Sequence, residues 1–387
     1  MKSKLLFLLL LLGSSYITAQ TVIENPPFET RQGSIHTISK IELSPTETRL
    51  TIRTVFRPQW WTSLDSLTYI YAPESKKQLY PLRIEGRKFG EQVTTPASGI
   101  IEDDCVITYP PLPEGTTRID WMDDNLNSET HTYGILLVKP QETKEQASLR
   151  KIHGNWQQAD AQNGWDIGIY DSLALMDNRF WKYDLCRKQG KKFKLNLKDE
   201  TGEQCLLEIT QEKDGNLCIG KNGGKANKYI RAGRPQRNYA ATTAATAPQT
   251  AFFRKDTVHI RGFLDGYSPK LGFTTVLIYT DNHITNEGTP AVVTIHPDGR
   301  FESDFVVNYP GVHHLSMGNN WMTFYIRPGE TLMLYINWED HLDYLRQRRL
   351  KPMLTETLYM GPSSSINQEL MPCEPLLSKD YPLIQNA

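Results

Sequence analysis

The stretch Leu50-Thr51-Ile52-Arg53-Thr54-Val55-Phe56 decides the fold class. Leu50, Ile52 and Phe56 fall on one side of an extended chain, and Thr51 and Arg53 fall on the other, which is the period of two of a half-buried strand. Residues 67–71 and 106–109 follow the same pattern, and the turn-rich segment 110–115 is typical of the breaks between them. Many short strands without helical periodicity between them predict a β-sandwich over residues 20–140.

A second β unit is predicted over residues 150–232. Alternating segments at 193–197 and 205–209 are separated by the turn sequences 199–202 and 212–216, as hairpins require. We expect a small meander that forms either an open sandwich or a partial barrel.

Residues 233–250 are rich in Ala and Thr and form the clearest linker in the chain. A third sandwich is predicted over 251–338, with Pro297-Asp298-Gly299-Arg300 as a turn in which glycine is available for a positive φ. Residues 339–387 are expected to be a charged helix and a tail. The predicted fold class is therefore mainly β, with three consecutive small β-sandwich or partial-barrel domains and a short helical or irregular C-terminal tail.

The first nineteen residues have the pattern of a secretory signal peptide. Lys2 and Lys4 precede an apolar run from Leu5 to Leu12, and small residues end at Ala19. No later stretch approaches the length of apolar sequence that a transmembrane span requires. We expect an exported protein that is periplasmic, bound to the cell envelope or secreted.

The overall charge gives no electrostatic reason to expect nucleic acid or an anionic membrane as a partner. The chain has 43 basic and 44 acidic residues and a net charge of −1. No cofactor and no metal are predicted: His313 and His314 are adjacent, so a strand points them to opposite faces. The aspartates at 103–104, 120 and 123–124 are interpreted as solvated turns, with a calcium site as the weaker alternative.

The five cysteines, at 105, 186, 205, 218 and 373, include no Cys-x-x-Cys pair, so no redox dithiol or zinc knuckle is predicted. In an oxidising compartment, two of Cys186, Cys205 and Cys218 are candidates for a disulfide. The alternative interpretation is that these residues are small buried core residues.

Four tryptophans are candidate platforms for a stacked ligand, Trp60, Trp61, Trp156 and Trp165. For Trp156 and Trp165 the alternative is that they fill a small β core.

The third unit resembles a known family. Residues 297–301, the Tyr309-Pro310 break, residues 326–332 and the later segments 359–361 and 366–370 are similar to the N-terminal region of TlpA-like thiol:disulfide oxidoreductases from Bacteroidetes. Residues 22–29 and 43–48 resemble the start of the longer members. Family members carry a thioredoxin domain with a Trp-Cys-x-x-Cys site after this region, and this chain has no such pair before Ala387. We interpret it as a truncated or diverged relative to which dithiol exchange does not transfer.

Three segments match the Asp-(Ser/Thr)-apolar pattern of periplasmic O-glycosylation in the bacterial group that the chain resembles. The candidate modified residues are Ser66, Ser172 and Thr257. About one match is expected by chance at ordinary residue frequencies.

The leading functional hypothesis is a non-catalytic scaffold or partner-binding protein of the cell envelope, related to the accessory region of a thioredoxin-like oxidoreductase. Exposed strand edges are the expected contact with an envelope protein partner. The alternative is a glycan- or ligand-binding surface protein. An enzyme with a site hidden in the fold is the third hypothesis, because nucleophile-elbow, metalloprotease and phosphate-loop motifs are missing from the sequence.

Overall fold

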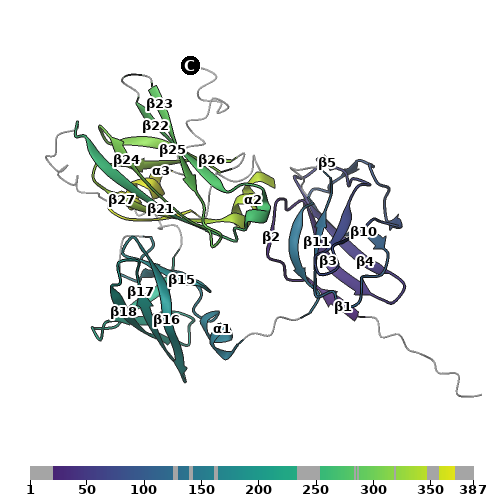
Figure 1. Ribbon diagram of the computed structural model, residues 1–387, viewed down its shortest axis with the longest axis horizontal. Helices are drawn as coiled ribbons and strands as arrows, with labels where there is room; N and C mark the ends of the chain where they lie inside the picture. Colours follow the sequence, from purple (N-terminus) through teal and green to yellow (C-terminus); the bar gives the residue numbers. More distant parts are fainter. Residues whose placement is uncertain are drawn as a thin grey trace, which may run out of the picture. The chain divides into compact units, whose positions relative to one another are not determined.

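The structure, a computed structural model, describes residues 21–124, 130–138, 143–160, 164–232, 253–282, 285, 287–317, 320–346 and 357–370. The chain divides into two compact units, residues 1–139 and 140–387 (Figure 1). The described residues are mainly β, so the predicted fold class is confirmed. The predicted signal peptide and the predicted linker at 233–250 lie outside the described residues.

The first unit contains two five-stranded sheets, in the orders β1-β3-β4-β10-β8 and β2-β12-β11-β6-β7, and a two-stranded sheet of β5 and β9. The strands are β1 (Thr21–Glu24), β2 (Thr30–Arg31), β3 (His36–Leu43), β4 (Thr48–Val55), β5 (Trp61–Thr62), β6 (Tyr69–Ala72), β7 (Lys77–Leu79), β8 (Arg83–Glu85), β9 (Val93–Thr94), β10 (Ile100–Tyr109), β11 (Arg118–Met122) and β12 (Thr132–Leu136).

The core of the first unit lies between its two larger sheets. Leu50 and Ile52 of β4 pack there with Ile107 of β10 and Trp121 of β11. The Trp121 indole donates a hydrogen bond of 3.0 Å to the Tyr109 hydroxyl, which satisfies its only polar atom. The alternation at residues 50–52 therefore places its apolar members in the core, as the sequence predicts.

The second unit begins with helix α1 (Lys144–Leu149) and a closed eight-stranded barrel, the closed form of the predicted meander. The barrel strands are β13 (Gly154–Gln158), β14 (Ile167–Ile169), β15 (Leu173–Met176), β16 (Arg179–Gln189), β17 (Lys192–Lys198), β18 (Gln204–Gln211), β19 (Leu217–Lys221) and β20 (Asn227–Arg231).

Side chains alternate between the inside and the outside of the barrel. On β17, Phe193, Leu195 and Leu197 are buried in the barrel core, whereas Lys192 and Lys194 are exposed. A barrel of this strand number has an interior that side chains can fill. The barrel interior is therefore a packed core.

A sandwich of two four-stranded sheets follows, in the orders β24-β21-β27-β28 and β23-β22-β25-β26. The elements are β21 (Asp256–Asp265), η1 (Pro269–Leu271), β22 (Thr275–Asn282), β23 (Glu287–Thr294), β24 (Arg300–Val307), β25 (Gly311–Met317), β26 (Asn320–Ile326), β27 (Thr331–Asn337), α2 (Trp338–Arg346), β28 (Leu358–Met360) and α3 (Ser364–Leu370). Gly299 has the expected positive φ of 86° in the turn before β24.

The segment after residue 338 contains a strand and a second helix in addition to the predicted helix. Its β28 pairs with β27 in antiparallel register, and Tyr359 is buried in the sandwich core. In α3, the Asn367 amide accepts a 2.6 Å hydrogen bond from the Tyr325 backbone and donates one of 2.7 Å to the Tyr325 carbonyl. Residues 358–367 therefore complete the sandwich. No helix among the described residues is long and apolar enough to span a membrane.

The barrel and the sandwich share a buried aromatic cluster. Tyr170 of the barrel stacks on Tyr335 of β27 with ring centroids 5.5 Å apart and an interplanar angle of 12°. Phe263 and Trp165 pack around this pair. The Tyr335 hydroxyl donates a 2.9 Å hydrogen bond to Asp265, and burial raises the pKa of both phenols, which keeps them neutral donors.

This cluster predicts coupled unfolding of the barrel and the sandwich. Tyr335→Ala should lower the free energy of unfolding by about 3 to 5 kcal/mol because it leaves a large cavity. Tyr335→Phe, which keeps the ring and loses the hydrogen bond to Asp265, should cost only about 1 kcal/mol. Denaturant unfolding followed by circular dichroism measures both. Equal stability of the Ala and Phe variants would contradict a packing role.

Candidate functional site

The first unit has a surface hollow of about 540 Å³ beside β5. The segment 61–66 supplies most of one wall. The remaining lining residues come from the start of β3, the end of β4, the β8–β9 connection and the two ends of the β11–β12 connection. The lining residues are Ile35, His36, Phe56, Trp61, Thr62, Ser63, Leu64, Asp65, Ser66, Phe89, Gly90, Asp123 and Thr130. Three of these side chains are aromatic, two are carboxylates and four are hydroxyls, a mixture suited to a ligand with both apolar faces and polar groups.

Trp61, which begins β5, and Trp60, which precedes it, are both exposed, and β5 lies outside the two large sheets. Trp61 is 55% exposed and Trp60 is 45% exposed. Trp61 pairs with Thr94 of β9, and the Trp60 carbonyl accepts hydrogen bonds from the Thr95 backbone (2.9 Å) and hydroxyl (3.1 Å). The backbone of both tryptophans is thus held in place while their rings remain in solvent.

Neighbouring side chains hold the Trp60 ring. The Arg57 guanidinium lies over it at 4.6 Å from the ring centroid, and the Phe56 ring meets it edge-on at 6.3 Å. A cation over an indole face is attracted by the ring quadrupole. Arg57 therefore occupies one face of Trp60, whereas Trp61 is the tryptophan that lines the hollow.

A chain of hydrogen bonds runs beneath the hollow. The Thr54 hydroxyl donates to Asp104 (2.6 Å), and His36 contacts Thr54 through Nδ1 (3.0 Å) and Thr62 through Nε2 (3.1 Å). A carboxylate can only accept, and a hydroxyl has one proton, so Thr54 must accept from Nδ1–H of His36. Nε2 then accepts from the Thr62 hydroxyl, whose oxygen keeps lone pairs for a ligand in the hollow.

Burial of His36 is consistent with this neutral ring. Burial and, to a lesser extent, the charge of Arg87 lower its pKa from 6.5 to about 3. Arg87 is itself buried, with its Nη1 atom 3.1 Å from Asp104. His36 is therefore held in place and stays neutral near neutral pH.

Of the aspartates interpreted as solvated turns, Asp103 and Asp124 are exposed, whereas the side chains of the other three are buried. Asp104 reaches Arg87 next to a register shift in β10, where Asp103 has a φ of 47°. Asp120 accepts a 2.6 Å hydrogen bond from the Gly134 backbone, and Asp123 accepts from Thr130 at 2.7 Å. The solvated-turn interpretation was wrong for these three residues, because the sequence does not reveal a bulge or a buried arginine.

Trp156 and Trp165 are buried and offer no face to a ligand. Trp156 lies in the barrel core, where its indole donates to the Ile152 carbonyl at 2.9 Å. Trp165 belongs to the aromatic cluster that joins the barrel to the sandwich. The prediction of a stacking platform was therefore wrong for Trp156 and Trp165, and only Trp60 and Trp61 are exposed enough to stack on a ligand.

Cys186, Cys205 and Cys218 are thiols, and no disulfide joins any two of them. Their cross-strand partners in the barrel are Leu195, Leu197 and Thr210 respectively, so the register brings no two sulfurs opposite one another. The disulfide that the sequence left open is therefore not formed in the structure. Cys373 lies outside the described residues.

The candidate glycosylation residues occupy different environments. Ser66 and Ser172 are exposed, whereas Thr257 is half-buried in β21. Ser66 also lines the hollow beside β5. A sugar on Ser66 would occupy the space that a ligand of this hollow needs.

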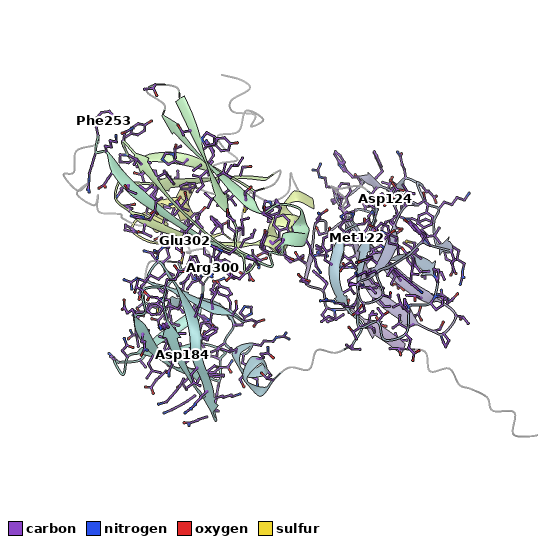
Figure 2. All side chains as sticks on the ribbon, in the orientation of Figure 1. Met122, Asp124, Asp184, Phe253, Arg300 and Glu302 are labelled. Carbon is purple, nitrogen blue, oxygen red and sulfur yellow. The ribbon has the colours of Figure 1, made fainter. Side chains whose placement is uncertain are left out.

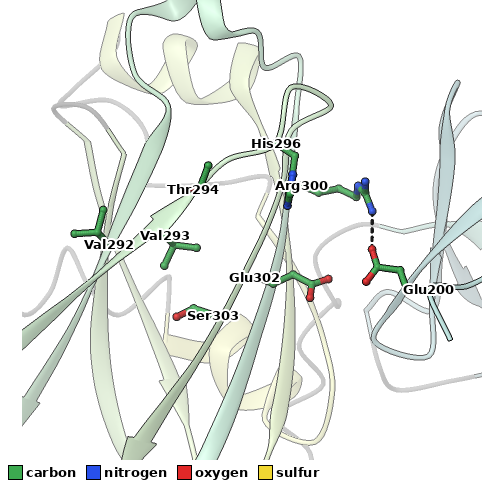
Figure 3. A pocket seen from close by; sticks show the side chains of 8 residues that line it. All are labelled: Glu200, Val292, Val293, Thr294, His296, Arg300, Glu302 and Ser303. Carbon is green, nitrogen blue, oxygen red and sulfur yellow. Dashed lines mark hydrogen bonds and ion pairs between the residues drawn. The ribbon is translucent and has the colours of Figure 1, made fainter.

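A second hollow, of about 500 Å³, lies against β23 and β24 (Figure 3). Its Arg300 forms a 3.0 Å ion pair with Glu200 of the barrel and lies over the Phe180 ring at 5.5 Å. Burial raises the pKa of Glu302, which also lines this hollow. No aromatic residue lines it among the described residues, and its arginine is engaged in joining the barrel to the sandwich.

No family model and no curated protein matches this chain. Among solved structures, a pullulanase from Bacillus acidopullulyticus aligns over 77% of this chain and 34% of its own, with 8% identity and a TM-score of 0.16. A tetra-tandem repeat in the extending region of a large adhesion protein aligns over 82% of this chain and 77% of its own, with 9% identity and a TM-score of 0.10. The chain thus spans about a third of the pullulanase. Similarities this weak carry no argument about function.

His36 predicts a pH dependence of stability. In the unfolded chain its pKa returns to 6.5, so between pH 6.5 and about 3 the unfolded state binds a proton that the folded state does not. This residue should therefore remove up to about 1.4 kcal/mol of stability per pH unit as the pH falls through that range. In His36→Gln the decline measured by denaturant unfolding at pH 7 and pH 5 should be smaller. An unchanged decline would show that His36 is not neutral in the fold.

Proposed function

We propose that this chain is an exported, non-catalytic binding protein whose first unit binds a glycan at the hollow beside β5. The single observation that carries the proposal is the exposed Trp61 ring at the wall of that hollow, next to the exposed Trp60. Burial of an aromatic side chain stabilises a fold, so large aromatic rings that stay exposed next to one another often mark a binding surface.

The polar groups of the hollow support a sugar as the ligand. A sugar ring has an apolar face that stacks on an aromatic ring and hydroxyls around its edge that donate and accept hydrogen bonds. Trp61 offers the aromatic face, the Thr62 oxygen offers an acceptor, and the exposed Asp65 and Ser63 lie on the same wall. A small number of fixed polar groups beside an aromatic surface is the usual composition of a small-molecule site.

The fixed base of the hollow supports binding by a preformed site. Thr62 is held by His36, which is held through Thr54 to Asp104 and Arg87. A ligand that meets a preordered surface loses less free energy to ordering of the protein. Because burial lowers the pKa of His36 to about 3, a change in its charge should not alter binding between pH 6 and pH 8.

The binding test uses Trp61→Ala in the mature chain. Because the variant removes the stacking surface, we expect glycan affinity to fall at least about tenfold, which corresponds to about 1.4 kcal/mol. A glycan array identifies the ligand first, and calorimetry with the best oligosaccharide then measures the affinity. The protein should come from a host without O-glycosylation, so that Ser66 is unmodified.

Leu82→Ala is the matched control, because Leu82 is an exposed apolar residue of the same unit that does not line the hollow. Its affinity should equal that of the unsubstituted protein. Equal affinity of Trp61→Ala and Leu82→Ala for the same oligosaccharide would reject the site. A protein that binds no glycan on the array would reject the proposed function.

We also propose that the chain is a relative of the thiol:disulfide oxidoreductases that does not catalyse dithiol exchange. Burial raises the pKa of Cys205, and raises that of Cys105 to about 12, which opposes the thiolate that exchange requires. We expect no reduction of insulin above the uncatalysed rate in a turbidity assay with dithiothreitol. Turnover that is lost in Cys218→Ser, a substitution of a half-buried cysteine, would contradict the non-catalytic proposal.

A further inference from the structure

The outer face of the β16–β17 hairpin of the barrel is strongly basic. Residues 179–198 contain eight basic residues and one acidic residue, Asp184, which Figure 2 labels on the barrel. The whole chain has a net charge of −1, so its near-neutral balance conceals a local excess of positive charge. This hairpin is the feature from which the inference starts.

Most of these cations are not neutralised within the fold. Lys194 forms a 2.7 Å ion pair with Glu208, and Arg179 pairs with Asp199 at 3.0 Å. No carboxylate of the described residues pairs with the remaining six, Lys182, Arg187, Lys188, Lys191, Lys192 and Lys198. All six are exposed.

The register of the hairpin places like charges directly opposite one another. Arg187 faces Lys194, and Lys182 faces Lys198. Directly opposed like charges destabilise a pair of antiparallel strands. Lys194 is balanced by its ion pair with Glu208, but the stability of the barrel does not explain why Lys182, Arg187 and Lys198 are basic, whereas an anionic partner that lies over them would.

A groove adjoins this face. It has a volume of about 280 Å³, and Lys151, Lys188, Lys191 and Lys213 line it around the Phe193 ring. Glu212 also lines the groove, but it is engaged with Lys228 at 3.2 Å. The groove thus extends the positive surface beyond the two strands.

The geometry points to an acidic polysaccharide as the partner of this face. Outward residues of a strand, such as Lys192 and Lys194, recur about every 7 Å, which gives a row of cations for a linear chain with repeated carboxylate groups. A membrane surface requires apolar side chains that insert, and Leu185 is the only exposed large apolar side chain of the described residues in β16 and β17. Single-stranded nucleic acid requires exposed aromatic platforms, and the aromatic rings of Trp181 and Phe193 are buried.

The test measures binding of polygalacturonate to the mature chain by calorimetry at low salt, with neutral dextran as the reference polymer. Arg187→Glu should weaken the binding at least tenfold, and an increase from 50 to 300 mM salt should weaken that of the unsubstituted protein several-fold, because exposed charges are screened. Lys77→Glu makes the same change of charge on an exposed strand of the first unit and should leave the affinity unchanged.

Arg187→Glu also allows a check that the loss of binding is not caused by unfolding. Arg187→Glu turns a like-charge pair with Lys194 into an opposite-charge pair, so its melting temperature should not fall. Affinity for polygalacturonate that is unchanged in Arg187→Glu would overturn the inference, as would tighter binding to anionic phospholipid vesicles or to single-stranded DNA.

Discussion

Side chains of a β-strand point alternately to opposite faces, and this constraint governs every feature of the protein. In the barrel it sends Phe193, Leu195 and Leu197 inward and leaves lysines outside. In the first unit it gathers Leu50 and Ile52 into the core. On β5 the same alternation buries Thr62 and leaves the neighbouring Trp61 exposed.

Two sets of buried polar groups are held by hydrogen bonds to one another. His36, Thr54, Asp104 and Arg87 form one such chain beneath the hollow, and Tyr335 and Asp265 hold the junction of the barrel and the sandwich. A buried polar group without partners would be costly, so each member fixes the protonation and orientation of the next. The hollow is therefore a surface feature supported by a buried network.

The fold was more predictable than the site. The period of two and the turn at residues 297–300 predict strands, because both follow from local backbone geometry. Trp60 and Trp61 could be selected as candidate platforms, but their sequence neighbourhood did not separate them from Trp156 and Trp165. His36 and Arg87 were missed altogether, since nothing near either residue in the sequence indicates the partners that surround it. The eight basic residues of the hairpin lie close together in the sequence, but the net charge of the whole chain gives no sign of them.

Local sequence patterns were enough to predict a mainly β protein and the positions of most strands, because alternation and turn chemistry act over a few residues. The folded structure was needed to show that β13 to β20 close into a barrel, that residues 358–360 return to the sandwich, and that Lys182 faces Lys198. It also decided which tryptophans are exposed. Closure, strand register and burial depend on contacts between residues far apart in the chain, and no local pattern contains that information.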